Sequence, residues 1–116
     1  MKLAVCLVGV IMTSMLIVPG RAAETWTNFG AGIRSCRAWT TSVGTSDRVE
    51  YEAWVFGFVS AFNRYGVLTD DNASKSTDGR GMLAWIDKYC TAHPSESIAV
   101  SADNLVFELI QGKAIR

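Results

Sequence analysis

The segment DRVEYEAWVFGFVSAFNRY, residues 47–65, decides the fold class of this chain. Its apolar side chains recur at the spacing of one face of an α-helix, at Tyr51, Val55, Phe58 and Phe62. Asp47 and Glu50 have the spacing of an N-terminal capping pair, and Gly66 ends the pattern. We therefore expect a long helix over residues 47–65 with one large apolar face.

A second line on the same helix consists of small residues. Ala53, Gly57 and Ala61 repeat every four residues, about a quarter-turn from the apolar face. Small side chains let another helix approach closely. The same repeat occurs in membrane helix pairs, but charged residues such as Arg48 and Arg64 on this helix exclude a lipid setting. The pattern predicts the central helix of a bundle, with a neighbour packed on the small residues.

Two helices are expected to carry the cysteines of the mature chain. Ser35 is a suitable N-cap for a short helix that holds Cys36 and Trp39 and ends before Gly44. Another helix is predicted from about Gly79 to Ala92, and Pro94 enforces its end. Its inward residues are Met82, Ile86, Tyr89 and Cys90, and His93 at its end favours the helix dipole.

A fourth helix closes the predicted bundle. Ser95 is its expected N-cap, and a clean apolar stripe follows at Ile98, Ala102, Leu105, Val106 and Leu109. Val100 and Phe107 fall on the outer, polar side of this helix. Two explanations are open for them: the N-terminal segment covers them, or they form a partner or dimer surface.

The connecting segments look less regular. Glu24–Gly32 has no clear period and is expected to lie extended over the core. Thr69–Gly81 is rich in Asp, Ser and Gly, which predicts a surface loop. Its aspartates do not follow the spacing of a calcium-binding loop, so we expect no metal site there.

The N-terminus has the features of a secretory signal peptide. Lys2 precedes the apolar run Leu3–Val18, and small residues allow cleavage after Ala22. A membrane anchor is the alternative, but a run of about 16 residues is shorter than the ~20 that cross a bilayer. We expect residues 1–22 to be removed and residues 23–116 to form one domain in the periplasm or outside the cell, with no membrane attachment afterwards.

Cys36 and Cys90 remain after this cleavage, and an even number of cysteines in an oxidising compartment indicates a disulfide. Closing a loop of about 55 residues stabilises a fold by roughly 4 kcal/mol in the chain-entropy model. A metal site or a reactive thiol is the alternative. Neither is favoured, because the chain has no Cys-x-x-Cys pair and only one histidine, His93.

The charge balance and the motifs exclude several classes of function. Without Lys2 and Arg21, about nine basic side chains face eleven acidic ones, which argues against nucleic acid or anionic lipid as a partner. No nucleophile with a base, carboxylate pair or metal cluster is evident, so we expect no enzyme, no catalytic residue, no metal and no cofactor. Four tryptophans are either core residues or the lining of a ligand cleft, at Trp26, Trp39, Trp54 and Trp85.

Several of these features together resemble the HdeA family of periplasmic acid-stress chaperones. They are Ser35-Cys36 followed by Trp39, Gly57-Phe58 with Ala61 and Asn63, the inward Cys90 and the final amphipathic helix. The resemblance covers most of residues 23–116. This chain departs from the family in a longer interval between its cysteines, through Thr69–Gly81, and in a last helix without dense lysine clusters.

The resemblance implies an all-α, single-domain bundle of four helices, the first one short, closed by the bond Cys36–Cys90. It also implies a homodimer at neutral pH that dissociates and loosens as carboxylates become protonated, and that then binds unfolding client proteins. Phe56, Val100 and Phe107 are the candidate client or dimer residues, because they lie away from the main apolar stripes.

Two other functions remain open. The segment Trp85–Leu109 resembles the C-terminal half of periplasmic immunity proteins that neutralise secreted amidase toxins, and Thr69–Gly81 would then enter the cleft of the cognate toxin. A ligand-binding module of the cell envelope that uses the tryptophans is the third candidate.

Overall fold

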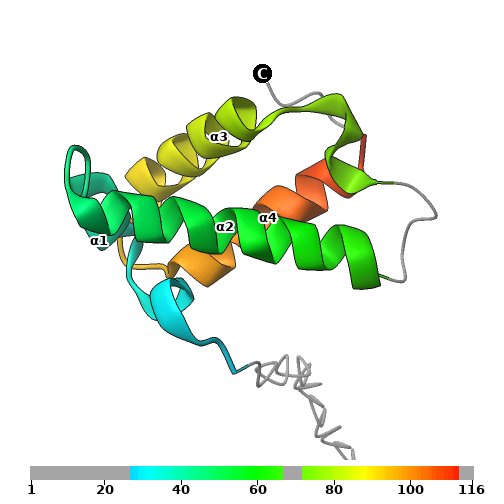
Figure 1. Ribbon diagram of the computed structural model, residues 1–116. Coiled ribbons are helices and arrows are strands. Elements are labelled where there is room, and N and C mark those ends of the chain that lie inside the picture. The colour runs from blue at the N-terminus through cyan, green and yellow to red at the C-terminus, as the bar shows by residue number, and fades with distance from the viewer. Residues whose placement is uncertain (1–26, 67–71, 113–116) are drawn as a thin grey trace, which may run out of the picture.

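The computed structural model describes residues 27–66 and 72–112. Their elements are η1 (Gly30–Ile33), α1 (Cys36–Thr41), α2 (Ser46–Tyr65), η2 (Ala73–Ser76), α3 (Gly79–Ala92) and α4 (Ile98–Ile110), where η marks a short 3-10 helix. In Figure 1, α2 runs across the front, α4 passes behind it, and α3 lies above it. The predicted all-α bundle of four helices with a short first helix is confirmed. The signal peptide expected over residues 1–22 lies outside the described residues.

The disulfide between Cys36 and Cys90 joins α1 to α3, as predicted. Ser35 caps α1, since its hydroxyl oxygen accepts from the Ala38 backbone N–H at 3.2 Å. Both sulfurs are fully buried. The short first helix therefore holds its cysteine against the middle of the fold.

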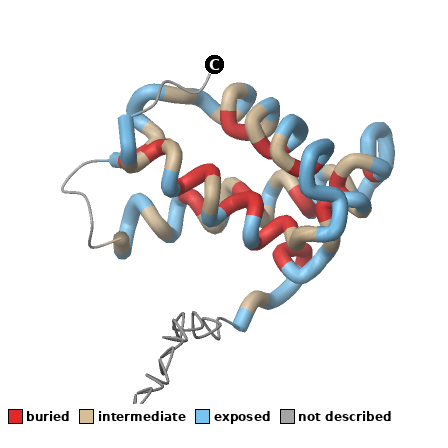
Figure 2. The backbone as a smooth tube through the Cα atoms, turned by 180° about the vertical axis from the view of Figure 1, so that it is seen from behind, coloured by how far each residue is buried: buried red, intermediate tan, exposed pale blue. Residues whose placement is uncertain are grey.

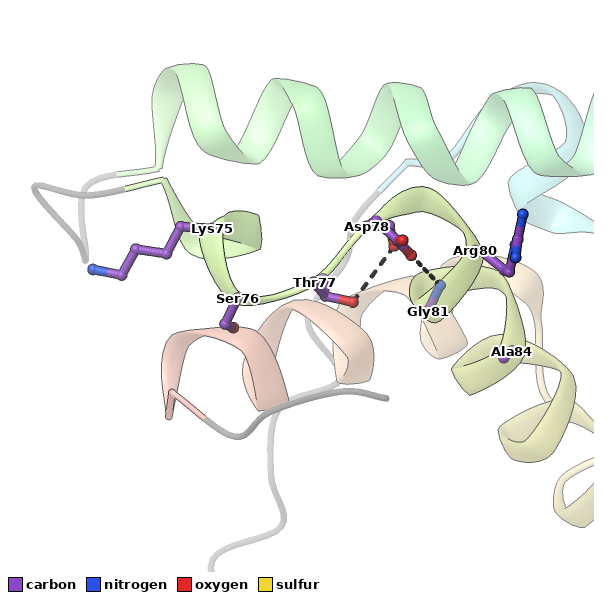
Figure 3. A pocket seen from close by; sticks show the side chains of 7 residues that line it. All are labelled: Lys75, Ser76, Thr77, Asp78, Arg80, Gly81 and Ala84. Carbon is purple, nitrogen blue, oxygen red and sulfur yellow. Dashed lines mark hydrogen bonds between the residues drawn. The ribbon is translucent and has the colours of Figure 1, made fainter.

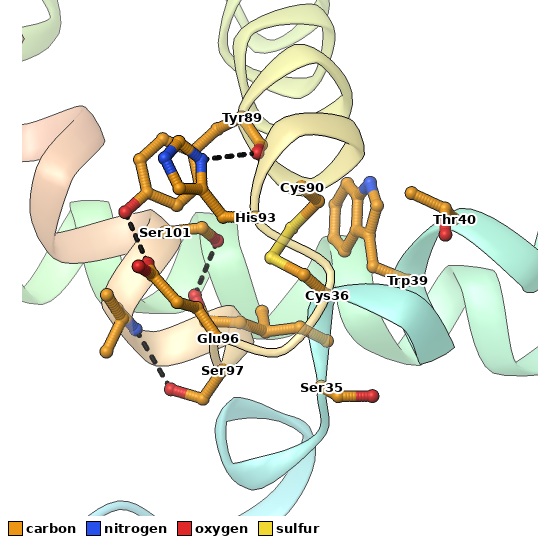
Figure 4. The surroundings of a disulfide bond; sticks show 12 residues. Ser35, Cys36, Trp39, Thr40, Tyr89, Cys90, His93, Glu96, Ser97 and Ser101 are labelled. Carbon is orange, nitrogen blue, oxygen red and sulfur yellow. Dashed lines mark hydrogen bonds between the residues drawn. A yellow bond between two sulfur atoms is a disulfide. The ribbon is translucent and has the colours of Figure 1, made fainter.

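The segment before α1 also pairs with the connection between α3 and α4, next to the disulfide (Figure 4). The Cys36 N–H donates to the Glu96 carbonyl at 2.7 Å, and the Ile98 N–H donates to the Arg34 carbonyl at 2.8 Å. These bonds and the disulfide together anchor the start of α1 to both sides of the α3–α4 turn.

The core lies between α2, α3 and α4, where Figure 2 shows the buried backbone positions in red. The predicted inward stripe of α4 is confirmed, since all five of its residues are buried. From α3, Met82, Ile86 and Cys90 are buried, and Tyr89 is half-buried. The expected role of α4 in closing the bundle is thus confirmed.

The buried face of α2 differs in part from the prediction. Tyr51 and Val55 are buried as expected, but Val59 completes the line, while Phe58 and Phe62 are only half-buried. Tyr51, Val55 and Val59 form a row at four-residue spacing that faces the core, and Phe58 and Phe62 lie beside this row. Their large rings cover the side of the core rather than its centre.

The small residues of α2 do not receive a helix. Ala53, Gly57 and Ala61 are all exposed, and a Cβ added at Gly57 would meet no atom within 4 Å. The prediction of a neighbouring helix on this line is wrong within the described residues. The physical reason is that α4 packs on the larger side chains of α2, which bury more apolar surface.

Two helix starts were also predicted wrongly. The N-cap of α2 is Thr45, not Asp47, and its hydroxyl donates to the Ser42 carbonyl instead of capping. The N-cap of α4 is Ser97, not Ser95, and its hydroxyl accepts from the Val100 N–H at 3.2 Å. By contrast, α3 has the predicted bounds.

The connecting segments contain more structure than expected. Phe29 is 78% exposed, whereas Ala31 and Gly32 of η1 are buried. The extended conformation predicted for 24–32 is therefore wrong at η1. The predicted position over the core is confirmed there, because Ala31 belongs to the core and η1 packs against α2 and α4. Trp26 lies outside the described residues. The predicted loop over 69–81 holds η2, and its last residues already belong to α3. None of the described helices is long and apolar enough to cross a membrane.

Candidate functional site

Val100 and Phe107 are exposed on the outer face of α4, at 43% and 60% of their surface. Asn104 lies between them on the same face, and its amide donates to the Val100 carbonyl at 2.8 Å. The described N-terminal segment does not cover the pair, so the covering explanation fails for that segment. The other explanation, that Val100 and Phe107 form a partner surface, is consistent with their exposure.

Phe56 occupies a different environment from these two residues. It is half-buried and packs against the core, with its ring beside Gly79 at the start of α3. Of the three predicted interaction residues, the structure thus leaves Val100 and Phe107 open and turns Phe56 inward.

An aromatic stack on α3 lies next to this face of α4. The rings of Trp85 and Tyr89 are 5.2 Å apart, and those of Tyr89 and His93 are 4.2 Å apart. Asn104 links the stack to α4, because its amide donates to the Tyr89 hydroxyl at 3.1 Å. Aromatic rings and the two open apolar residues therefore belong to neighbouring helix faces.

The Tyr89 hydroxyl donates to the Glu96 carboxylate, which lies in the α3–α4 turn (Figure 4). Partial burial and this bond to an anion raise the pKa of Tyr89 to about 12. The hydroxyl is therefore a fixed donor at neutral pH, and it ties α3 to the turn that also receives the Cys36 N–H.

His93 is the C-cap residue of α3, as predicted. Its backbone N–H donates to the Tyr89 carbonyl at 3.0 Å, and its Nδ1 lies 2.9 Å from the same oxygen. The position at a helix C-terminus suits a positive imidazole. No described side chain forms a nucleophile–histidine pair with it, and its geometry is that of a helix end.

A second polar cluster joins α1, α2 and α3 at Asp87. One oxygen of its carboxylate accepts from the Trp39 indole N–H at 2.7 Å and from the Arg48 guanidinium at 2.8 Å. Arg48 also donates to Glu52 at 2.6 Å and lies over the Trp39 ring, 4.0 Å from its centre. Partial burial disfavours the Arg48 charge, but the bonds to Glu52 and Asp87 outweigh this and raise its pKa.

Trp39 is fully buried, so Asp87 satisfies an indole N–H that would otherwise lack a partner in the core. Neither Arg48 nor Asp87 was among the predicted site residues. The i,i+4 pair of Arg48 and Glu52 is visible in the sequence. The contact of Trp39 with Asp87 spans 48 positions and has no local signal.

A surface hollow beside α3 does not resemble a tryptophan-lined cleft. It has a volume of about 610 Å³ and lies beside the start of α3, among polar residues such as Thr77 and Asp78. Lys75 and Arg80 extend from its opposite ends, and Asp78 caps α3 through the Gly81 N–H (Figure 3). Trp39 is a core residue, and Trp54 and Trp85 are half-buried. The described tryptophans therefore form no shared cleft here.

Within residues 27–66 and 72–112, no group of three His, Cys, Asp or Glu side chains could hold a metal ion. The predicted disulfide accounts for both cysteines there.

No protein-family model, curated protein or solved structure matches this chain. The features of this chain that bear on its function are the two carboxylate-centred clusters and the open face of α4.

Proposed function

We propose that the mature protein is an exported, non-enzymatic chaperone, similar to the HdeA family, whose bundle loosens in acid and then binds unfolding proteins. The position of Asp87 is the observation that supports this most strongly. A single carboxylate connects three helices, so protonation of one group removes charged contacts from α1 and α2 together.

The physical effect of acid follows from this arrangement. Acid removes the charge of carboxylates in general. The bonds that Arg48 and the Tyr89 hydroxyl make to carboxylates are the polar contacts of this fold that depend on such a charge. The mature chain then carries about ten positive charges, which repel one another. Both effects favour a loosened state in which the helices separate but the backbone stays partly helical.

The disulfide limits how far the chain opens. It does not depend on pH in this range, so α1 stays tied to α3 when the polar clusters fail. The loosened protein then presents Val100 and Phe107 together with apolar side chains of the former core. Such a surface suits many unfolding proteins, and its use needs no ATP or cofactor.

The test is a light-scattering assay with an aggregating client protein at pH 7 and at about pH 2.5, with the oxidised residues 23–116. We expect suppression of aggregation in acid and little at pH 7. Replacement of both open residues, V100S with F107S, should weaken suppression. V43S should not, because Val43 is even more exposed, at 73%, but lies in the turn after α1 instead of on α4.

A protein that stays well packed in acid and protects no client would overturn this function. One tight partner at neutral pH without client protection would favour the inhibitor of a secreted toxin instead. A small ligand that changes tryptophan fluorescence, without either of these results, would favour the ligand-binding module.

A further inference from the structure

Asn72 directly precedes η2, and its side chain is exposed. It begins the sequence Asn72-Ala73-Ser74, which has the pattern Asn-x-Ser of an acceptor for N-linked glycans. The other asparagines of the chain have no Ser or Thr two positions later; they are Asn28, Asn63 and Asn104. The sequence therefore offers one position for this modification.

The surroundings of Asn72 leave room for a glycan. Asn72 is the N-cap of the four-residue η2, so it lies at the start of a short turn and not within a long helix. A glycan is bulky and polar, and it can be attached only where the side chain reaches solvent. The exposed side chain of Asn72 meets this requirement, while the apolar contact of η2 with the core is made by the buried Ala73.

The side chain of Asn72 is oriented by the third residue of the pattern. Its Oδ1 accepts from the Ser74 hydroxyl at 2.7 Å and from the Ser74 backbone N–H at 3.0 Å. The Ser74 hydroxyl oxygen accepts in turn from the Asn63 side-chain amide at 2.9 Å. The Asn63 Oδ1 also accepts from the Ala73 N–H at 3.1 Å. The last turn of α2 thus holds all three residues of the acceptor sequence in place.

The same hydrogen bonds leave the nitrogen of the Asn72 amide available. Asn63 and Asn104 both use their side-chain nitrogens as donors, whereas the Asn72 Nδ2 donates to no described residue. The two bonds to Oδ1 also stabilise the negative charge that this oxygen gains when the nitrogen gives up a proton. The Ser74 hydroxyl is therefore placed to assist bond formation at the Asn72 nitrogen.

We propose that Asn72 is an N-glycosylation site, to which an oligosaccharyltransferase transfers a glycan from a lipid-linked oligosaccharide. The Asn72 nitrogen forms a bond with C1 of the first sugar, and the bond between this carbon and the diphosphate oxygen of the donor breaks. The amide proton passes to a base of the transferase, and the lipid diphosphate leaves. The site depends on export of the chain but not on chaperone activity.

Mass spectrometry of the protein from its own cells tests the site, with the peptide that contains Asn72 fragmented to locate any added sugar. We expect sugar on Asn72. N72Q and S74A should each lose the added mass completely, whereas S74T should keep it, because threonine retains the hydroxyl. N28Q is the matched control and should keep the added mass, because Asn28 lies outside any Asn-x-Ser or Asn-x-Thr pattern.

An unmodified Asn72 in the protein from its own cells would overturn the proposal. So would sugar that S74A leaves in place, or sugar found only on serine or threonine side chains. Far-UV circular dichroism of each variant checks that the fold is retained. The light-scattering assay of client protection does not involve Asn72, so the glycosylation site and the chaperone function can fail separately.

Discussion

At the scale of single residues, buried polar groups determine which contacts the bundle cannot lose. The Trp39 ring fills the core beside the disulfide, and its N–H needs an acceptor that water cannot supply. Asp87 provides that acceptor and at the same time orients Arg48 over the ring. The buried Trp39 N–H and the Arg48 ion pair at the surface therefore both depend on the Asp87 carboxylate.

Replacement of this carboxylate by an amide tests the dependence. For D87N we expect a loss of about 1 kcal/mol in the free energy of unfolding at pH 7, because a half-exposed charged acceptor becomes a neutral one. Urea unfolding measures it. D103N is the control, since Asp103 is exposed and forms no ion pair with another described residue. Equal stability of the two variants would contradict the role of Asp87.

The raised pKa of Tyr89 predicts that the fold loses stability as the pH rises into the alkaline range. This is opposite in sign to the loss of stability expected in acid. Its pKa is raised from 10.0 to about 12, so the folded chain holds this proton more tightly than the unfolded chain. The stabilisation is complete below pH 10 and is lost as the pH rises towards 12. Thermal melts of Y89F between pH 9 and pH 12 should show a smaller loss than the wild type, whereas Y65F, at an exposed tyrosine, should follow the wild type. Parallel curves for Y89F and wild type would rule out this linkage.

At the scale of elements, patterns within one helix were predictable and contacts between helices were not. Ser35 is recognisable as a cap from the sequence, because it directly precedes the apolar positions Cys36 and Trp39. Ser95 and Ser97 are equivalent in the sequence, and the choice of Ser97 follows from the pairing of Ile98 with Arg34 across the fold. Similarly, the period of α2 is clear in the sequence, but the positions of its neighbours α4 and η1 decide that Ala53 and Gly57 face outward.

For the candidate site, too, patterns within one helix could be predicted and contacts between helices could not. The exposure of Val100 and Phe107 could be predicted, because they lie off the apolar stripe of a single helix. The inward position of Phe56 depends on where α3 begins, and the cluster at Asp87 depends on three helices. No local pattern encodes either contact.

The two serines before α4 allow a direct test of the helix start. S97A should lower the free energy of unfolding by about 1 kcal/mol, because the Val100 N–H loses its acceptor. S95A should change it by only a few tenths, since Ser95 is exposed and lies outside the cap. Chemical denaturation of both variants checks this, and a larger effect of S95A would show that α4 begins earlier.

At the scale of the whole molecule, one covalent bond and a few polar contacts hold a small core together. The disulfide joins α1 to α3 across a sequence separation of 54 residues, and backbone hydrogen bonds of Arg34, Cys36 and Arg37 reach the α3–α4 turn and the start of α4. The polar clusters at Asp87 and Tyr89 act on the same helices. Under the proposed function, acid weakens the polar clusters but leaves the disulfide intact, so we expect the helices to loosen without complete unfolding.

Reduction of the disulfide should lower the free energy of unfolding by about 4 kcal/mol at pH 7. For so small a domain this is a large part of the total stability. Thermal melts with and without a reductant measure the difference. An unchanged melting temperature would mean that the helices hold together without the bond.

The most direct test of the acid-loosened bundle is near-UV circular dichroism of the oxidised protein between pH 7 and pH 2. This signal depends on fixed aromatic side chains, chiefly the buried Trp39 beside Asp87. We predict that it collapses below about pH 3, while the far-UV signal keeps most of its helical intensity. A near-UV spectrum at pH 2 that equals the one at pH 7 would contradict the proposed mechanism.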